Sequence, residues 1–237
     1  MRAYFVLSSV CTNFATFMKK TIYSKYDKQR IGQLPKVIFE GRVIVIQNDS
    51  DCEKAVQYLL GQPLIGLDTE TRPSFKKGKG HLVSLLQLST PDTCFLFRLN
   101  RIGIKDPIRN LLESNDTVKV GLSLNDDVLS LHRRADFKPG AFIDLQKHIG
   151  ELGIEDLSLQ KIYANLFGEK ISKGQRLTNW DADVLTEAQK RYAATDAWAC
   201  IMIYNEYLRL KATGDYELIV VEPEITENES INDKNNV

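Results

Sequence analysis

The sequence predicts an α/β fold in which a mixed β-sheet is flanked by helices. An apolar run over residues 64–67 ends in two acidic residues and is typical of a buried central strand. Two further apolar segments flank Thr90-Pro91-Asp92 and predict a β-hairpin over residues 83–99. After this hairpin, strand and helix patterns alternate, which indicates one domain with helices packed on a sheet.

The expected elements follow from the spacing of apolar residues and from the residues that begin or end helices. Asn48, Asp49 or Ser50 is expected to cap the first helix, because each side chain can accept a hydrogen bond from the first turn. By the same reasoning, Asn125 or Asp126 is the expected cap of the third helix. The strands are expected at residues 42–47, 64–69, 83–88, 94–99, 118–124 and 142–145, and the helices at residues 50–60, 108–113, 127–135, 157–167 and 187–210.

The composition is that of a globular domain, since 43% of the 237 residues are apolar and 26% are charged. No apolar run approaches the roughly 18 residues that a membrane helix needs, so no membrane contact is expected. The four cysteines have no Cys-x-x-Cys spacing, which disfavours a zinc site and a disulfide framework. Free cysteines indicate a reducing compartment, so we expect the protein in the cytoplasm, or in the nucleus if its source is eukaryotic.

The net charge of zero conceals an uneven distribution of charge along the chain. Residues 217–237 hold six of the 31 acidic residues and one of the 31 basic residues, so residues 1–216 hold 25 and 30 and carry a net charge of +5. We therefore expect residues 1–216, which include a domain over residues 40–216, to be mildly basic, and residues 217–237 to form an acidic, disordered tail. Residues 1–39 are expected to form a partly disordered extension, with Met1 and Met18 both candidate start residues.

Acidic residues at two distant positions indicate a metal site. Asp68 and Glu70 follow the central strand and project to the same side, because side chains alternate along a strand. Tyr192 and Asp196 are four residues apart in a helical segment and therefore share one face, which is otherwise apolar. Carboxylates gathered on buried faces repel one another unless cations lie between them.

A third acidic position lies in the Gly121-Leu-Ser-Leu-Asn-Asp-Asp127 run, where Asp126 and Asp127 are both candidates. On a helix, Asp127 falls on the same side as Leu124, Val128 and Leu131, whereas Asp126 points about 100° away. The helical spacing therefore favours Asp127 as the inward-facing carboxylate.

These motifs resemble those of the Asp-Glu-Asp-Asp 3′–5′ exonucleases, in the branch that contains a tyrosine. The family pattern of Asp-x-Glu, a glycine-led run ending in Asp, and Tyr-x3-Asp matches Asp68/Glu70, Gly121 to Asp127, and Tyr192/Asp196. The likeness spans roughly residues 40 to 212 and is greater to the Werner-type exonuclease domains than to ribonuclease D. It implies a ribonuclease H-like mixed sheet in a single exonuclease domain.

The resemblance also implies roles for these residues and a pair of divalent cations. Asp68, Glu70 and Asp196 would hold the catalytic ion, and Asp68 would bridge to a second ion that Asp127 contacts largely through water. Tyr192 would orient the attacking water. Oxygen ligands favour Mg²⁺ or Mn²⁺ over zinc.

Basic and aromatic residues near these motifs are candidates for binding the nucleic-acid substrate. Cations can hold phosphates without reading sequence, and a ring can stack on a base. For Trp180, ordinary core packing is an equally good interpretation. The expected substrate contacts are Thr69, Arg72, Phe75, Lys76, Lys77, Arg176 and Trp180, with Lys170 and Lys173 on the same wall as the last two.

The favoured function is a metal-dependent 3′–5′ exonuclease that releases nucleoside 5′-monophosphates from nucleic-acid 3′ ends. The Werner-type resemblance favours DNA as the substrate, and the ribonuclease D resemblance keeps RNA as an alternative. A catalytically silent nucleic-acid-binding domain is the second hypothesis, and a carboxylate-pair glycosidase is a distant third. The chain has no Gly-x4-Gly-Lys-Ser/Thr pattern, so no helicase motor is expected in it.

Overall fold

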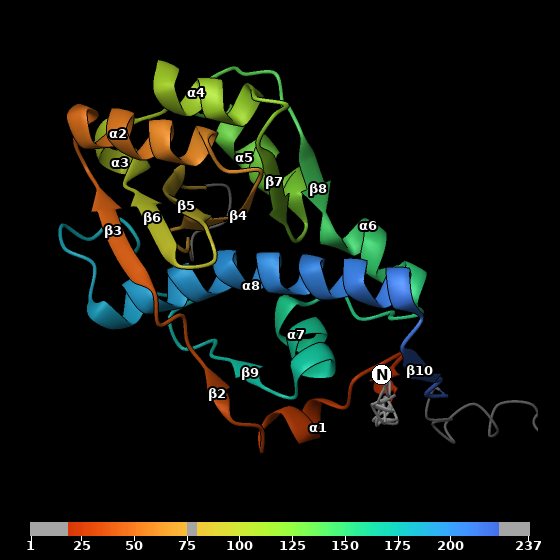
Figure 1. Ribbon diagram of the computed structural model, residues 1–237. Coiled ribbons are helices and arrows are strands. Elements are labelled where there is room, and N and C mark those ends of the chain that lie inside the picture. The colour runs from red at the N-terminus through yellow and green to blue at the C-terminus, as the bar shows by residue number, and fades with distance from the viewer. Residues whose placement is uncertain (1–18, 75–79, 223–237) are drawn as a thin grey trace, which may run out of the picture.

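The protein is built around a six-stranded sheet with the strand order β3-β6-β5-β4-β7-β8 (Figure 1). The computed structural model describes residues 19–74 and 80–222. The strands of this sheet are β3 (Arg42–Ile46), β4 (Leu64–Thr71), β5 (Val83–Ser89), β6 (Thr93–Phe97), β7 (Val118–Gly121) and β8 (Phe142–Asp144).

The sheet is mixed, as the sequence predicts. The pairs β4–β5 and β5–β6 are antiparallel, which confirms the hairpin around Thr90-Pro91-Asp92. The pairs β3–β6, β4–β7 and β7–β8 are parallel. Strand β4 lies between β5 and β7, so the acidic residues at its end stand in the interior of the sheet rather than at an edge.

Helices cover both faces of the sheet (Figure 1). One hydrophobic core joins the sheet to the helices of the first face, and a second core joins the other face to the long helix α8 and its neighbours. The first face carries α2 (Asp49–Leu60), α3 (Leu99–Ile102), α4 (Asp106–Glu113) and α5 (Leu124–His132); the second carries α6 (Leu145–Ile149), a 3-10 turn (Gly150–Leu152), α7 (Leu159–Phe167) and α8 (Glu187–Thr213). None of the helices in the described ranges is long and apolar enough to cross a membrane.

Helix α8 lies unusually close to the central strand. A Cβ atom placed on Gly66 of β4 would be 1.9 Å from the carbonyl oxygen of Ala197, so only glycine fits at this crossing. The helix begins with a capping box in which Thr186 and Gln189 satisfy each other's backbone N–H groups. The close crossing at Gly66 sets the depth at which α8 rests on the sheet.

The start of α5 differs from the sequence prediction. The helix begins at Leu124, and its N-cap is Ser123 in a left-handed conformation with φ of 63°, not Asn125 or Asp126. The carboxylate of Asp144, at the end of β8, accepts hydrogen bonds from the backbone N–H groups of Ser123 (2.9 Å) and Leu124 (3.1 Å). A carboxylate from a neighbouring strand therefore replaces the local cap, which no local sequence pattern could indicate.

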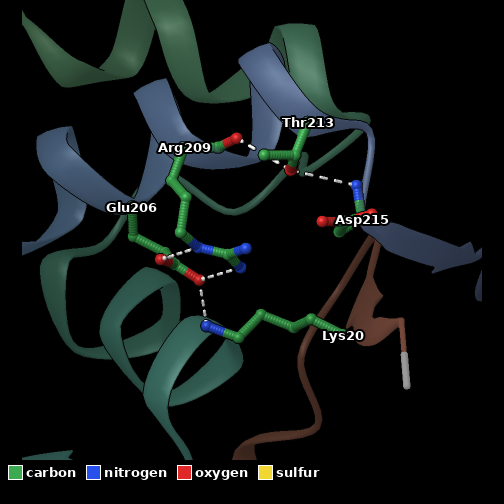
Figure 2. A network of polar contacts seen from close by, with 5 residues as sticks. All are labelled: Lys20, Glu206, Arg209, Thr213 and Asp215. Carbon is green, nitrogen blue, oxygen red and sulfur yellow. Dashed lines mark hydrogen bonds and ion pairs between the residues drawn. The ribbon is translucent and has the colours of Figure 1, made fainter. Parts of the chain in front are cut away.

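Ordered elements lie on both sides of the expected domain of residues 40–216. Residues 19–39 contain β1 (Lys20–Tyr23), α1 (Lys28–Ile31) and β2 (Lys36–Val37), which are part of the fold. Strand β10 (Tyr216–Ile219) pairs with β1 in parallel, so the ordered body extends beyond residue 216. Beside this pair, the carboxylate of Glu206 in α8 accepts hydrogen bonds from the side chains of Lys20 and Arg209 (Figure 2). Residues 223–237 of the expected tail lie outside the described residues.

Replacing Gly66 by alanine should destabilise the protein by about 3 kcal/mol, because the added methyl group forces α8 away from β4. Chemical denaturation followed by circular dichroism measures this free energy of unfolding. Gly150→Ala is the matched control, since a Cβ atom there meets no described atom within 4 Å. Equal stabilities of the two variants would contradict the close-crossing explanation.

Candidate active site

Three of the predicted acidic residues meet where α8 crosses β4. Asp68, Glu70 and Asp196 each place a carboxylate oxygen within 4.8 Å of the other two. Glu70 and Asp196 are buried, with 9% and 8% of their surfaces exposed, and Asp68 is half-buried. The strand therefore supplies two carboxylates and the helix supplies the third.

The fourth acidic residue, Asp127, lies beside this trio and is held by the same strand. Thr69 points to the opposite side of β4 from Asp68 and Glu70, and its hydroxyl donates a hydrogen bond of 2.5 Å to the Oδ1 atom of Asp127. Asp127 is partly buried in the first turn of α5, whereas Asp126 is exposed. The structure thus places Asp127, rather than Asp126, beside β4, where its charge raises the pKa values of Asp68 and Glu70 and the Thr69 hydroxyl is its hydrogen-bond partner.

Tyr192 lies one helical turn before Asp196 and donates a hydrogen bond to its carboxylate. The Tyr192 ring packs against Trp180, with 6.1 Å between the ring centroids. Trp180 is fully buried, so it supports the tyrosine from behind and cannot stack on a substrate base. This burial favours core packing over substrate contact, the two interpretations of Trp180 that the sequence left open.

The shared burial of these acids raises their pKa values. Burial, followed by the charges of Asp196 and Asp127, raises the pKa of Glu70 to about 9, whereas Arg176 lowers it. Burial raises the pKa of Asp196 to about 7, against the lowering effects of the Tyr192 hydrogen bond and Lys173. Burial and then the charges of the other three acids raise the pKa of Asp68 well above its usual range.

The donor set fits a divalent cation. The three clustered groups are all carboxylates, which are the hard oxygen ligands that Mg²⁺ and Mn²⁺ take in proteins. A cation would offset the mutual repulsion that the raised pKa values of Asp68 and Glu70 reflect. The acidic cluster therefore suggests that divalent metal ions bind here.

A cavity of about 230 Å³ opens beside the acidic cluster. Tyr192 and Asp196 form part of its wall, and two exposed cations, Lys173 and Arg176, line it from the segment before α8. Arg72 is exposed just past the end of β4. Of the other predicted substrate contacts, Phe75, Lys76 and Lys77 lie outside the described residues.

Two residues that shape the site were not predicted from the sequence. Gly66 admits α8 to the sheet, and Asp144 holds the turn from which Asp127 projects. An aspartate at the end of a strand and before a helix is a recognisable cap signal, and Asp144 does cap α6 through the backbone N–H of Gln146. Its second partner, the start of α5, is visible only in three dimensions.

A mixed sheet with a buried acidic cluster beside a cation-lined cavity fits a nuclease. The chain belongs to the 3′–5′ exonuclease family, because the family model described as a 3′–5′ exonuclease matches residues 43–211. The predicted family and the predicted ribonuclease H-like fold class are confirmed, as is the assignment to enzymes that hydrolyse phosphodiester bonds.

Individual relatives agree with this family. The chain is 31% identical to the bifunctional 3′–5′ exonuclease/ATP-dependent helicase WRN of Mus musculus over an alignment of 191 residues that covers 76% of this chain and 14% of that protein. The Nibbler EXO domain of Aedes aegypti shares the fold with a TM-score of 0.67 at 20% identity, covering 75% of this chain and 92% of that one. Escherichia coli RNase D has a TM-score of 0.64 at 23% identity, covering 73% and 46%.

Metal-free protein should lose stability as the pH rises from about 4 to about 9. The folded-state pKa values of Asp127 (about 6), Asp196 (about 7) and Glu70 (about 9) lie above the unfolded values of about 4. The stabilising contribution is therefore complete below pH 4 and is lost as the pH rises through the folded values. Melting temperatures measured in chelator at several pH values test this.

Two comparisons sharpen the test of this pH dependence. Added Mn²⁺ should raise the melting temperature more at pH 8.5 than at pH 5.5, because the ligands must be deprotonated to bind metal. Glu70→Gln removes one clustered charge and should flatten the pH dependence. If the melting temperature of Glu70→Gln depended on pH as steeply as that of the wild type, other groups would have to cause the pH dependence.

Proposed function

We propose that the protein is a metal-dependent 3′–5′ exonuclease that removes nucleotides from the 3′ end of DNA and releases nucleoside 5′-monophosphates. The observation that carries the proposal is the meeting of Asp68, Glu70 and Asp196 at one point beside an open, cation-lined cavity. The substrate is proposed to be DNA because of the Werner-type likeness, and RNA is the alternative.

Two divalent ions, Mg²⁺ or Mn²⁺, would activate a water molecule and neutralise the charge that develops on the leaving 3′ oxygen. Asp68, Glu70 and Asp196 would hold one ion, and Asp68 would also contact the second. Asp127, oriented by the Thr69 hydroxyl, would help to hold the second ion. These four carboxylates lie on β4, α5 and α8.

Tyr192 would orient the attacking water through its hydroxyl group. Burial and the charges of Asp196 and Glu70 raise the pKa of Tyr192 far above its usual range, so the phenol stays protonated at neutral pH. A protonated phenol donates and accepts hydrogen bonds but takes no proton from water. The packing of Trp180 against the ring fixes the direction in which the hydroxyl points.

Lys173 and Arg176 are proposed to hold the phosphates of the strand that enters the cavity. Both lower the pKa of a clustered acid, Lys173 that of Asp196 and Arg176 that of Glu70, so both act electrostatically on the reaction centre. Arg72 would contact the backbone from the β4 side. Such contacts hold the strand without reading its sequence.

Cleavage of a DNA strand with a recessed 3′ end should require Mg²⁺ or Mn²⁺ and should proceed from that end. A substrate labelled at its 5′ end should give a descending ladder, and one labelled at its 3′ end should give mononucleotide at once. Asp68→Asn or Asp196→Asn should abolish both products while the protein stays folded. Full activity in excess chelator, or cutting of a closed circular strand, would disprove the proposal, and a matched RNA strand tests the alternative substrate.

Asp127→Ala should lower the cleavage rate by about 10- to 100-fold, because the removed carboxylate is proposed to contact the second metal ion largely through water. Asp126→Ala is the matched control at the preceding residue of the same helical turn and should leave the rate nearly unchanged, since its side chain is exposed. Steady-state rates at saturating Mg²⁺ provide the comparison. The reverse ranking would contradict the assignment of the inward face.

A further inference from the structure

The N-terminal strap, defined as residues 19–41, precedes the part of the chain that the family model matches. It runs from the C-terminal end of α8 back to its N-terminal end, with α7 and β9 (Lys170–Ile171) between its middle part and that helix (Figure 1). At the first end, β1 pairs with β10, and Lys20 contacts Glu206 of α8 (Figure 2). At the second end, β2 pairs with β9, which precedes the loop that leads into α8.

The strap forms its direct contacts with the catalytic turns of α8 through Arg191 and Thr195. The Nη1 atom of Arg191 donates hydrogen bonds to the carbonyl oxygens of Phe39 (2.9 Å) and Gly41 (2.7 Å). The backbone N–H of Phe39 donates to the hydroxyl of Thr195 (3.0 Å), which in turn donates to the carbonyl of Arg191 (2.7 Å). The side chain of Phe39 is buried beside Trp198.

The partner segment of these contacts is itself fixed to the sheet. The backbone N–H of Arg42 donates to the carbonyl of Asp92 in the β5–β6 turn (2.9 Å). A Cβ atom on Gly41 would lie 2.3 Å from that same carbonyl oxygen, so the strap passes the turn in close contact. Arg191 is therefore tied to a segment that is anchored to the β5–β6 turn.

Helical geometry explains why this anchor matters for the site. Successive residues of a helix advance by about 100°, so residues 191 and 195 share one side of α8, residues 192 and 196 the next, and residues 193 and 197 the third. The third side rests on the sheet at Gly66. The first side is held by the strap, and the side between them carries Tyr192 and Asp196.

We propose that Arg191 and Thr195 are positioning residues, which fix the rotation of α8 so that Tyr192 and Asp196 face Asp68 and Glu70. The inference rests on the proposed exonuclease function. Contact with the sheet sets the depth of the helix, and the strap contacts prevent it from turning about its own axis. The strap is thereby part of the catalytic apparatus, although it lies outside the matched family region.

Four variants and one control test this role on the full chain. Arg191→Gln removes the charged guanidinium group, and Arg191→Lys keeps the positive charge but has one ammonium group as its donor. Thr195→Val removes the hydroxyl at nearly constant shape, and Thr195→Ser keeps it. Lys190→Gln is the control, because Lys190 forms its ion pair with Glu187 in the same turn of α8. The readouts are kcat and KM on DNA with a recessed 3′ end, the affinity for Mn²⁺ by calorimetry, and the folded fraction by thermal melting.

We expect Arg191→Gln and Thr195→Val to lower kcat by about 10- to 100-fold per folded molecule, as misplacement of a catalytic group by about 1 Å does. KM should change far less, and Mn²⁺ should bind more weakly because Asp196 is displaced. Arg191→Lys should fall between wild type and Arg191→Gln, and Thr195→Ser should be close to wild type. This order of effects supports positioning, since a simple loss of folded protein does not spare the conservative variants.

Equal kcat values for the Lys190→Gln, Arg191→Gln and Thr195→Val proteins would overturn the proposal, as would losses that only follow the folded fraction. If wild-type protein cleaves no nucleic acid, the proposed function fails separately. The Mn²⁺ affinities then decide the positioning role alone: equal affinities overturn it, and weaker binding by Arg191→Gln and Thr195→Val supports it.

Discussion

The backbone crossing between Gly66 and Ala197 is the constraint on which the rest of the site depends. A helix at ordinary packing distance from a sheet keeps its side chains between the two backbones, whereas here the carbonyl of Ala197 occupies the space of a missing side chain. The close approach brings Asp196, the preceding residue, near enough to the strand for its carboxylate to meet those of Asp68 and Glu70. A single glycine in the central strand thus converts a packing contact into a three-carboxylate cluster.

This arrangement has an electrostatic cost that the surrounding structure does not remove. Burial is the largest cause of the raised pKa values of Asp68, Glu70 and Asp196, and their mutual repulsion adds to it for Asp68 and Glu70. Groups such as the Tyr192 hydroxyl and Lys173 lower the pKa of Asp196, but they are too few to balance several buried negative charges. Bound cations would balance these charges, which would link folding stability to the metal of the proposed chemistry.

The sequence predicts the parts of the fold that repeat regularly or carry local signals. The strand ending at Asp68, the hairpin around Pro91 and the long helix with Tyr192 and Asp196 all have such signals, and the structure confirms those elements. The strap does not, because its strand β2 and the pairing partner β9 have two residues each and carry no periodicity. Trp180 was open to two interpretations, since neither burial nor the position of Tyr192 follows from spacing along the chain.

Helix α8 shows why a single apolar stripe describes a catalytic helix poorly. Its middle turns are buried on two sides. Ala193 and Ala197 are buried on the side that faces the sheet, and Thr195 is buried on the side that faces the strap. Asp196, on the side between these two, is also buried. Each side has a different partner: the sheet fixes depth, the strap fixes rotation, and the remaining side carries the chemistry. A helix restrained from two directions holds its catalytic groups against their own repulsion, which one packed face alone would not do.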